Sequence, residues 1–591
     1  MALVHRVNLN FNPLLGTYYC KCMINITRLK TIHAVKVQPK TVHDKNSTKF
    51  TTFEQMVLFR QNQARKTALV MMDSINMTDD VERFCMSYGR VLNIFPYYTK
   101  ANKVFLLVEY ETQNDVDHLN RNSVHRYTTG TINVITSLLL YRNQNHNFVK
   151  YKQPSMIKHY PYADFTVPTL TNIQHNLKQE KNVSQQMLLL YDTLKITDLN
   201  VRLRFFTAHQ LMFYLSKLFT NISVVPFGSS VNGFGQLGCD LDLICRIKNN
   251  KVWKKLTFLS QRLPLIEREE QKQFLAVLST ILGTCIPGIG NIRNILEARV
   301  PIIKFFNMNT NMQCDLSCGN ASALHMSELL YIYAELDWRV KPLVCTIRTW
   351  ARNCNLTQET AGHWITNFSL TLLIMFYLQI KNILPSLHFI ESIRGKHEDW
   401  QASLQFYFTS YFIFLVLEQN MHKVLGQYSW FTKWKISMPH RNTENLQELL
   451  HGFFEYYSIF DFKTQAICIR EGIVKAKRDN SPVYIYNPFD ATLNVSRNIT
   501  LVELSRLIDS FQIGLQILDF PEENVIVKLI KLEPCTYKSR NTSKALFLNV
   551  VSHGDKQNEN NSDRDELKHI NRITNENNTN VSANNKKSII K

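Results

Sequence analysis

The sequence predicts an α+β protein built from several domains, and three regions of different pattern support this prediction. Residues 50–141 alternate strand-like and helical segments in the order β-α-β-β-α-β. Residues 221–330 contain short apolar runs that are separated by glycine-rich or polar turns and carry carboxylates. Between residues 331 and 545, helical and aromatic-rich segments dominate. The predicted architecture is therefore two mixed domains followed by a mainly helical one.

Length and composition restrict the possible classes of function. The 591 residues are enough for about three or four domains, and a hydrophobic fraction of 45% is ample for folded cores. A net charge of +20 predicts a polyanionic partner, either nucleic acid or an anionic membrane surface, and charge alone does not choose between them. The 12 cysteines include no paired C-x-x-C sets, which favours reduced thiols over a zinc site.

Residues 1–45 have the composition of a mitochondrial transit peptide. No Asp or Glu occurs between Met1 and His43, where Arg and Lys are spread among apolar and hydroxyl residues. A basic terminus without a targeting role is the alternative. Of two apolar stretches, 361–380 contains too many polar residues to cross a bilayer, and 404–417 is too short. We therefore expect buried helices there and no transmembrane segment.

The first domain, residues 50–141, resembles an RNA recognition motif in its order of elements. Strands are expected at 67–74, 90–98 and 103–110, and helices at 80–88 and 114–120. Of the aromatic RNA-binding signature, the third strand keeps only Phe105 and Tyr110, and the first strand has no aromatic residue. Because such domains hold single strands by base stacking, a protein-docking role is as well supported as RNA binding. In the same strand, Val104, Leu106, Leu107 and Val108 are suited to packing in a dimer interface.

Three further segments connect or follow the domains. Residues 142–182 are expected to form a polar linker, since the prolines there argue against regular structure. Residues 183–220 carry an amphipathic pattern that predicts helices of the central domain leading into the next strand. The Asn-rich segment 552–591 is expected to be disordered, because it cannot bury enough apolar surface to fold.

A strand–turn–strand unit carries the first candidate site. Its strands are expected at 222–226 and 239–245. Asp240 and Asp242 lie two residues apart on the second strand, so both carboxylates point to one face of the sheet. Crowded carboxylates are costly unless they are protonated or bridged by a cation, and their hard oxygens suit Mg²⁺ or Mn²⁺. The spacing therefore predicts a metal site.

The turn between these strands predicts phosphate binding. Gly228 permits a close backbone approach, and Ser229 offers a hydroxyl at the start of an expected short helix. Gly233, Gly235 and Gly238 also spell G-x-G-x-x-G, the dinucleotide fingerprint. That fingerprint must open a crossover helix, whereas here an acid-bearing strand follows at once, and no H-R-D loop supports a kinase. A phosphate site beside a metal pair instead predicts nucleotidyl transfer.

A third carboxylate strengthens the metal-site prediction. Residues 300–305 are expected to form a strand, residues 307–311 a turn, and residues 313–317 the hairpin partner that carries Asp315. The order Gly-Ser, D-x-D and a later lone Asp resembles the nucleotidyltransferase superfamily that includes DNA polymerase beta and the poly(A) polymerases. The resemblance implies a polymerase-beta-like palm domain at 221–330 and a helical poly(A) polymerase-associated domain at 331–545.

Downstream residues match nucleotide-binding motifs of this superfamily. Arg348 and Arg352 lie four residues apart on one predicted helical face and correspond to cations that hold the triphosphate, with ordinary ion pairs as the alternative. The resemblance implies that Asn367 and Phe368 belong to the nucleotide site, that Phe368 stacks on the incoming base, and that Asn320 contacts the ribose. The family usually has lysines at the two arginine positions and Ser-Tyr where Asn367 and Phe368 stand.

The position of Leu493 predicts the choice of base. It precedes the Asn-Val pair of a segment that resembles the family's D-P-F…N-V motif. Relatives that add uridine often carry a histidine there, which hydrogen-bonds the pyrimidine. Leucine cannot donate such a bond and leaves an apolar wall suited to adenine.

Together these segments resemble the mitochondrial poly(A) polymerase branch of the superfamily. That resemblance implies AMP transfer from ATP to the 3′-hydroxyl of mitochondrial RNA, in the matrix, with two Mg²⁺ ions held by Asp240, Asp242 and Asp315. It also implies a homodimer formed through the first domain. The alternatives are a terminal uridylyltransferase, a small-molecule nucleotidyltransferase and an RNA-binding scaffold without activity. Basicity argues against the small-molecule substrate, and three costly carboxylates kept together argue against the scaffold.

Overall fold

The computed structural model describes most of the chain between residues 51 and 531. The described residues are 51–127, 130–133, 136–141, 157–163, 167–219, 222–247, 265–318, 321–358, 360, 362–393, 442–520 and 524–531. The predicted transit peptide, the predicted helix at 404–417, the 552–591 tail and Asn320 lie outside them. None of the described helices is both long and apolar enough to span a membrane.

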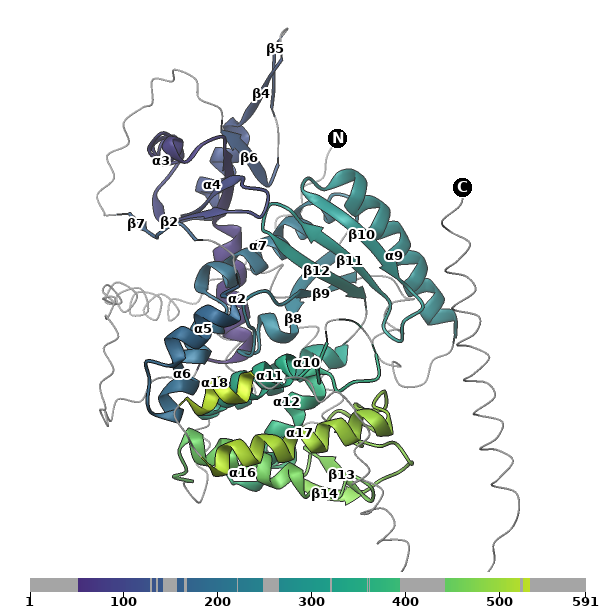
Figure 1. The fold of residues 1–591 in the computed structure, drawn as a ribbon. Coiled ribbons are helices and arrows are strands. Elements are labelled where there is room, and N and C mark those ends of the chain that lie inside the picture. Colours follow the sequence, from purple (N-terminus) through teal and green to yellow (C-terminus); the bar gives the residue numbers. More distant parts are fainter. Residues whose placement is uncertain are drawn as a thin grey trace, which may run out of the picture. The chain divides into compact units, whose positions relative to one another are not determined.

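The first domain has the predicted β-α-β-β-α-β order (Figure 1). Its elements are α2 (Phe53–Arg65), β1 (Thr67–Met72), η2 (Ile75–Met77), α3 (Thr78–Met86), β2 (Val91–Tyr98), β3 (Val104–Tyr110), α4 (Gln113–Asn122), a hairpin of β4 (Val124–Tyr127) and β5 (Gly130–Asn133), β6 (Leu138–Tyr141) and β7 (Lys158–His159). The strands form one sheet in the order β6-β1-β3-β2-β7, with β6 parallel to β1 and β3 antiparallel to both of its neighbours. Capping boxes at Thr52 and Thr112 start α2 and α4, each side chain accepting from a backbone amide three residues on.

The segment predicted as a linker, 142–182, contains regular structure. β7 pairs in parallel with β2, and α5 (Leu170–Leu177) begins at the cap residue Thr169. The prolines that argued against structure flank these elements: Pro161 follows β7 and Pro168 precedes α5. Proline is tolerated just outside a helix or strand. These two prolines therefore indicate where β7 ends and where α5 begins, and they do not indicate an unstructured stretch.

The second sheet belongs to the palm region. It contains β8 (Ile222–Phe227), β9 (Leu241–Ile247), β10 (Ile289–Ile295), β11 (Ile302–Asn307) and β12 (Met312–Cys318) in the order β10-β11-β12-β9-β8. β12 is parallel to β9, and the other pairs are antiparallel. Side chains alternate between faces, so Leu241, Leu243, Cys314 and Leu316 share a buried core with residues of α7 (Asp198–Leu215) and α9 (Leu265–Cys285). Asp242 and Asp315 point to the opposite face.

Eight further helices complete the described part of the chain, and aromatic rings connect three of them. They are α6 (Val183–Leu194), α10 (Ala321–Leu336), α11 (Val340–Asn353), α12 (Asn367–Ile380), α13 (Leu387–Ile393), α16 (Leu446–Ser458), α17 (Leu501–Asp519) and α18 (Val525–Ile530), joined by the strand pairs β13 (Gln465–Cys468)–β14 (Ile473–Ala476) and β15 (Tyr486–Asn487)–β16 (Asp490–Asn494). The rings of Trp350, Phe454 and Phe511 contact one another, which ties α11, α16 and α17 together. α6 packs against α11 and α16, whereas α7 packs against α2 and β8.

Both faces of the first sheet are buried within the chain. On one face, Val70, Leu106 and Val108 pack with residues of α3 and α4. The other face, with Phe105 and Leu107, shares a core with Leu203 of α7. The expectation that Val104, Leu106, Leu107 and Val108 pack in a dimer interface is therefore wrong, because every residue of β3 is already buried within the chain. Phe105 and Tyr110 are each 0% exposed, so neither ring is available for base stacking.

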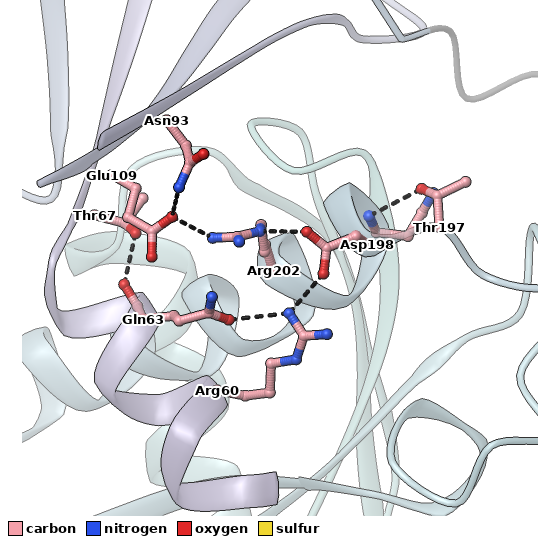
Figure 2. A network of polar contacts seen from close by, with 9 residues as sticks. Arg60, Gln63, Thr67, Asn93, Glu109, Thr197, Asp198 and Arg202 are labelled. Atoms are coloured by element: carbon pink, nitrogen blue, oxygen red, sulfur yellow. Dashed lines mark hydrogen bonds and ion pairs between the residues drawn. The ribbon is translucent and has the colours of Figure 1, made fainter. Parts of the chain in front are cut away.

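Polar contacts secure this buried face to α7 (Figure 2). Arg202 of α7 donates to Glu109 of β3 at 2.8 Å and to Asp198 at 2.6 Å, and its guanidinium lies over the Phe95 ring at 4.5 Å. Arg60 of α2 donates to the other oxygen of Asp198 at 2.6 Å. The Tyr97 hydroxyl donates to the Asn309 carbonyl, at the turn between β11 and β12, at 2.7 Å. The first sheet, α2, α7 and the palm hairpin therefore form one packed unit.

Candidate active site

Strand register places three charged residues in a row across the palm sheet. Asp315 of β12 lies directly opposite Asp242 of β9, and Lys304 of β11 lies directly opposite Asp315. Partners in register point to the same face, so their side chains share one volume. Asp240 precedes β9 by one residue and its side chain is 46% exposed. The structure thus brings together the three predicted catalytic carboxylates.

The electrostatics of this row favour a cation. Burial, followed by the charges of Asp315 and Asp240, raises the pKa of Asp242 to about 7. Burial likewise raises the pKa of Asp315, although Lys304 opposes that shift. Carboxylates with raised pKa values in a cleft are typical of sites that hold a metal or move a proton.

Lys304 is a site residue that sequence reasoning missed. Its Nζ atom lies 2.8 Å from Asp315 Oδ2 and 3.5 Å from Asp240 Oδ2. Burial opposes its charge, but these two carboxylates raise the Lys304 pKa above its ordinary value. The signal was present in the sequence, since Lys304 alternates with the apolar residues Ile303 and Phe305 on a predicted strand.

The donor set fits a hard divalent cation. Three carboxylates face one volume, and Asp315 Oδ1 is buried without a hydrogen-bond partner. In the part of the chain that the structure describes, no three Asp, Glu, His or Cys side chains already converge as a complete metal site. Lys304 Nζ instead lies within ion-pair distance of both Asp315 and Asp240.

The glycine-rich turn is held close to the carboxylates. Gly228 has a φ of +65°, and a Cβ atom there would lie 2.6 Å from Asp242 Oδ2, so only glycine fits. Its amide donates to Ser327 Oγ of α10 at 2.8 Å, a contact that the sequence did not indicate. The expected short helix is a single 3-10 turn, Gly228–Ser230, which is too short for a helix dipole of useful size. Ser229 is half-buried, and its hydroxyl lies 3.6 Å from Cys239 Sγ.

The two predicted triphosphate residues lie on α11 and contact the glycine-rich loop. Arg348 donates to the Phe234 carbonyl at 3.0 Å, and Arg352 donates to Gln236 Oε1 at 2.9 Å. Burial lowers the pKa of Arg348 below its ordinary value. Arg348 Nε also lies 3.5 Å from Asn367 Oδ1. The loop, both arginines and Asn367 are therefore neighbours, and their role in nucleotide binding stays a prediction.

The candidate base contacts come from two elements. Phe368 lies in the first turn of α12 and is 36% exposed, so its ring can still be covered by a ligand. Leu493 lies on β16 and is half-buried. The turn of the β15–β16 hairpin contacts α10, where the rings of Phe489 and His325 are 5.7 Å apart. The role of Leu493 in choosing the base stays a prediction.

Comparisons with known proteins place the chain in a family. Residues 183–335 match the family model "Poly(A) RNA polymerase, mitochondrial-like, central palm domain", and residues 445–492 match "Cid1 family poly A polymerase". The chain is 30% identical over 495 residues to "Poly(A) RNA polymerase, mitochondrial" of Drosophila melanogaster, which covers 80% of this chain and 77% of the fly protein. It is 31% identical over 486 residues to the Mus musculus protein of the same name, covering 80% and 78% respectively. The chain belongs to the mitochondrial poly(A) RNA polymerase family.

Solved structures agree with this membership. A crystal structure of mtPAP in complex with ATPgammaS matches with a TM-score of 0.66 at 28% identity, covering 82% of this chain and 100% of that chain. The apo form of mtPAP matches equally well. As a member of the family, the protein is a nucleotidyltransferase of the polynucleotide adenylyltransferase class with a polymerase-beta-like fold. The predicted family, fold class and enzyme class are confirmed.

Proposed function

We propose that this enzyme transfers AMP from ATP to the 3′-hydroxyl of mitochondrial RNA without a template. The observation that carries the proposal is the register of β9 and β12, which sets Asp315 opposite Asp242. Mitochondrial poly(A) polymerases as relatives and a solved mtPAP bound to ATPgammaS support the substrate and the organelle. The net charge of +20 supports a polyanionic acceptor such as RNA.

Asp240, Asp242 and Asp315 would hold two Mg²⁺ ions. Such ions, when bound, lower the pKa of an attacking hydroxyl and neutralise charge on a leaving pyrophosphate. The turn at Gly228 and Ser229 lies against Asp242, so a triphosphate bound to the Ser229 hydroxyl would lie beside the carboxylates. Mn²⁺ satisfies the same oxygen donors.

The remaining contacts orient the nucleotide. Arg348 and Arg352 supply fixed positive charge beside the glycine-rich loop, where β- and γ-phosphates would lie. Phe368 offers its face to the base, and Leu493 supplies an apolar wall that favours adenine over uracil. Stacking tolerates every base, so we expect preference for ATP and incomplete exclusion of other nucleotides.

Primer extension tests this proposal directly. Purified protein is incubated with an RNA primer, Mg²⁺ and each of the four ribonucleotides separately. We expect the longest products with ATP. Longer products with UTP would make the enzyme a terminal uridylyltransferase, and no product with any nucleotide would favour an RNA-binding scaffold. A reporter fused to residues 1–45 tests import into the mitochondrial matrix.

We also propose that the enzyme is a homodimer through its first domain. Because every residue of the central strand β3 is buried within the chain, we place the contact at an edge of the sheet. β6 is an edge of that sheet, and its Leu140 is 45% exposed. Leu140→Asp should convert dimers to monomers in light scattering while leaving the fold intact. Monomeric wild-type protein would contradict the proposal.

A further inference from the structure

Helix α7 carries a buried arginine that points into the catalytic loop. Arg204 is 2% exposed. Its Nη1 atom donates to Ser230 Oγ at 2.8 Å and to the Asp240 carbonyl at 2.9 Å, and its Nη2 atom donates to the Cys239 carbonyl at 2.7 Å. One guanidinium therefore holds both ends of the loop that joins β8 to β9.

The loop between these ends needs such a restraint. Gly233 and Gly238 have φ values of +85° and +83°, and glycines give a loop many alternative conformations. The loop runs from the 3-10 turn to Asp240, so any change in its path moves a catalytic carboxylate. A misplacement of about 1 Å in a catalytic group can lower a rate on the order of a hundredfold.

Stability alone does not account for Arg204. Taking a guanidinium out of water costs several kcal/mol unless it is fully paired. Among the described residues no carboxylate forms an ion pair with Arg204, and its Nε atom is buried without a hydrogen-bond partner. An apolar side chain would fill this position at lower cost, so the benefit of Arg204 lies in the groups that it holds.

We propose that Arg204 is a positioning residue for adenylyl transfer: it clamps Ser230 to Cys239 and Asp240, and so holds the Asp240 and Asp242 carboxylates in reactive geometry. The inference rests on the proposed function and assigns the residue to no substrate contact. Arg204 acts through the Ser230 hydroxyl and the Cys239 and Asp240 carbonyls that it binds. Its positive charge also opposes the burial that raises the pKa of Asp242, and Arg204→Lys keeps that charge.

Arg202 supplies a matched control on the same helix. Its side chain is 10% exposed, and it binds Glu109 and Asp198 on the side of the first sheet (Figure 2). Arg202→Lys and Arg204→Lys both keep the charge and lose the planar fork of donors. Only the second change affects a contact to the catalytic loop.

The test compares kcat, KM and Tm for the two variants. We expect Arg204→Lys to lower kcat about ten- to a hundredfold with little change in KM for the primer, and Arg202→Lys to lower Tm with kcat retained. Wild-type kcat in both variants would overturn the proposal. The same reduction of kcat in both variants would also overturn it.

Ser230→Ala keeps the test decisive if Arg204→Lys does not fold. It removes one acceptor of the clamp, so kcat should fall by a smaller factor, and an unchanged kcat would overturn the proposal. Combined with a foldable Arg204→Lys, its effect should be less than additive. Wild-type protein that extends no RNA would instead refute the proposed function, which separates the two failures.

Discussion

The two five-stranded sheets of this protein are covered in different ways. The first sheet is buried on one face by its own helices and on the other by α7, and its buried carboxylate Glu109 binds Arg202 and Asn93. The palm sheet is covered on one face by α7 and α9, and its other face carries Asp242, Asp315 and Lys304. The strand pattern alone therefore does not determine the role of a sheet. A sheet that is covered on both faces contributes to stability, whereas a face that stays uncovered can carry catalytic residues.

The palm carboxylates should dominate activity. Asp242→Ala removes a metal ligand but no phosphate-binding cation, so primer extension should fall on the order of a thousandfold or more, while RNA affinity by fluorescence anisotropy stays near wild type. Asp192→Ala is the control, because that carboxylate is 61% exposed and forms an ion pair with Lys195 on the protein surface. Extension by the Asp242→Ala variant at wild-type rates would contradict the metal-site assignment.

The first sheet should instead control stability. Phe105 is fully buried and stacks on Tyr97 at 5.4 Å, so Phe105→Ala should cost about 3–5 kcal/mol of unfolding free energy. Phe59→Ala, at a site that is 58% exposed, should cost little. Activity per folded molecule should stay constant in both. A sharp rise in KM for RNA at unchanged Tm would show that the sheet grips RNA after all.

The pH dependence of stability should separate the two sheets further. The folded state favours protonated Asp242, whose pKa is raised to about 7, so this carboxyl contributes stability that is complete below its ordinary pKa and lost as pH rises through about 7. In the presence of EDTA, Tm should therefore decline from about pH 4 to 7 in wild type relative to Asp242→Asn, and Mg²⁺ should reduce the decline. Parallel Tm curves for the two proteins would show that Asp242 is not perturbed.

The smallest effect should come from base choice. Leu493→His introduces a donor for uracil, so the ATP-to-UTP ratio of kcat/KM should shift toward UTP by about 1 to 3 kcal/mol. Tm serves as the control for folding. If wild type prefers UTP, or if the ratio does not move, Leu493 does not read the base.

Local elements were largely predictable because their causes are local. The strand expected at 222–226 is observed at Ile222–Phe227, and the strand expected at 103–110 is observed at Val104–Tyr110. Alternation of apolar residues and turn-forming residues acts over a few positions, so it can be detected in one chain. The prediction of an unstructured linker at 142–182 failed because the cause of the structure there is not local. β7 is stabilised by pairing with β2, which lies far away in the sequence.

The candidate site divides along the same line. The sequence by itself determined which carboxylates are available and that Asp240 and Asp242 share a face, because that follows from a spacing of two on a strand. Only the tertiary structure decided that Lys304 stands beside Asp315, that Arg204 holds the catalytic loop and that the first sheet has no free face. Each depends on strand register or on helix packing between residues far apart in the chain, and the chain order of residue types does not encode which distant surfaces meet.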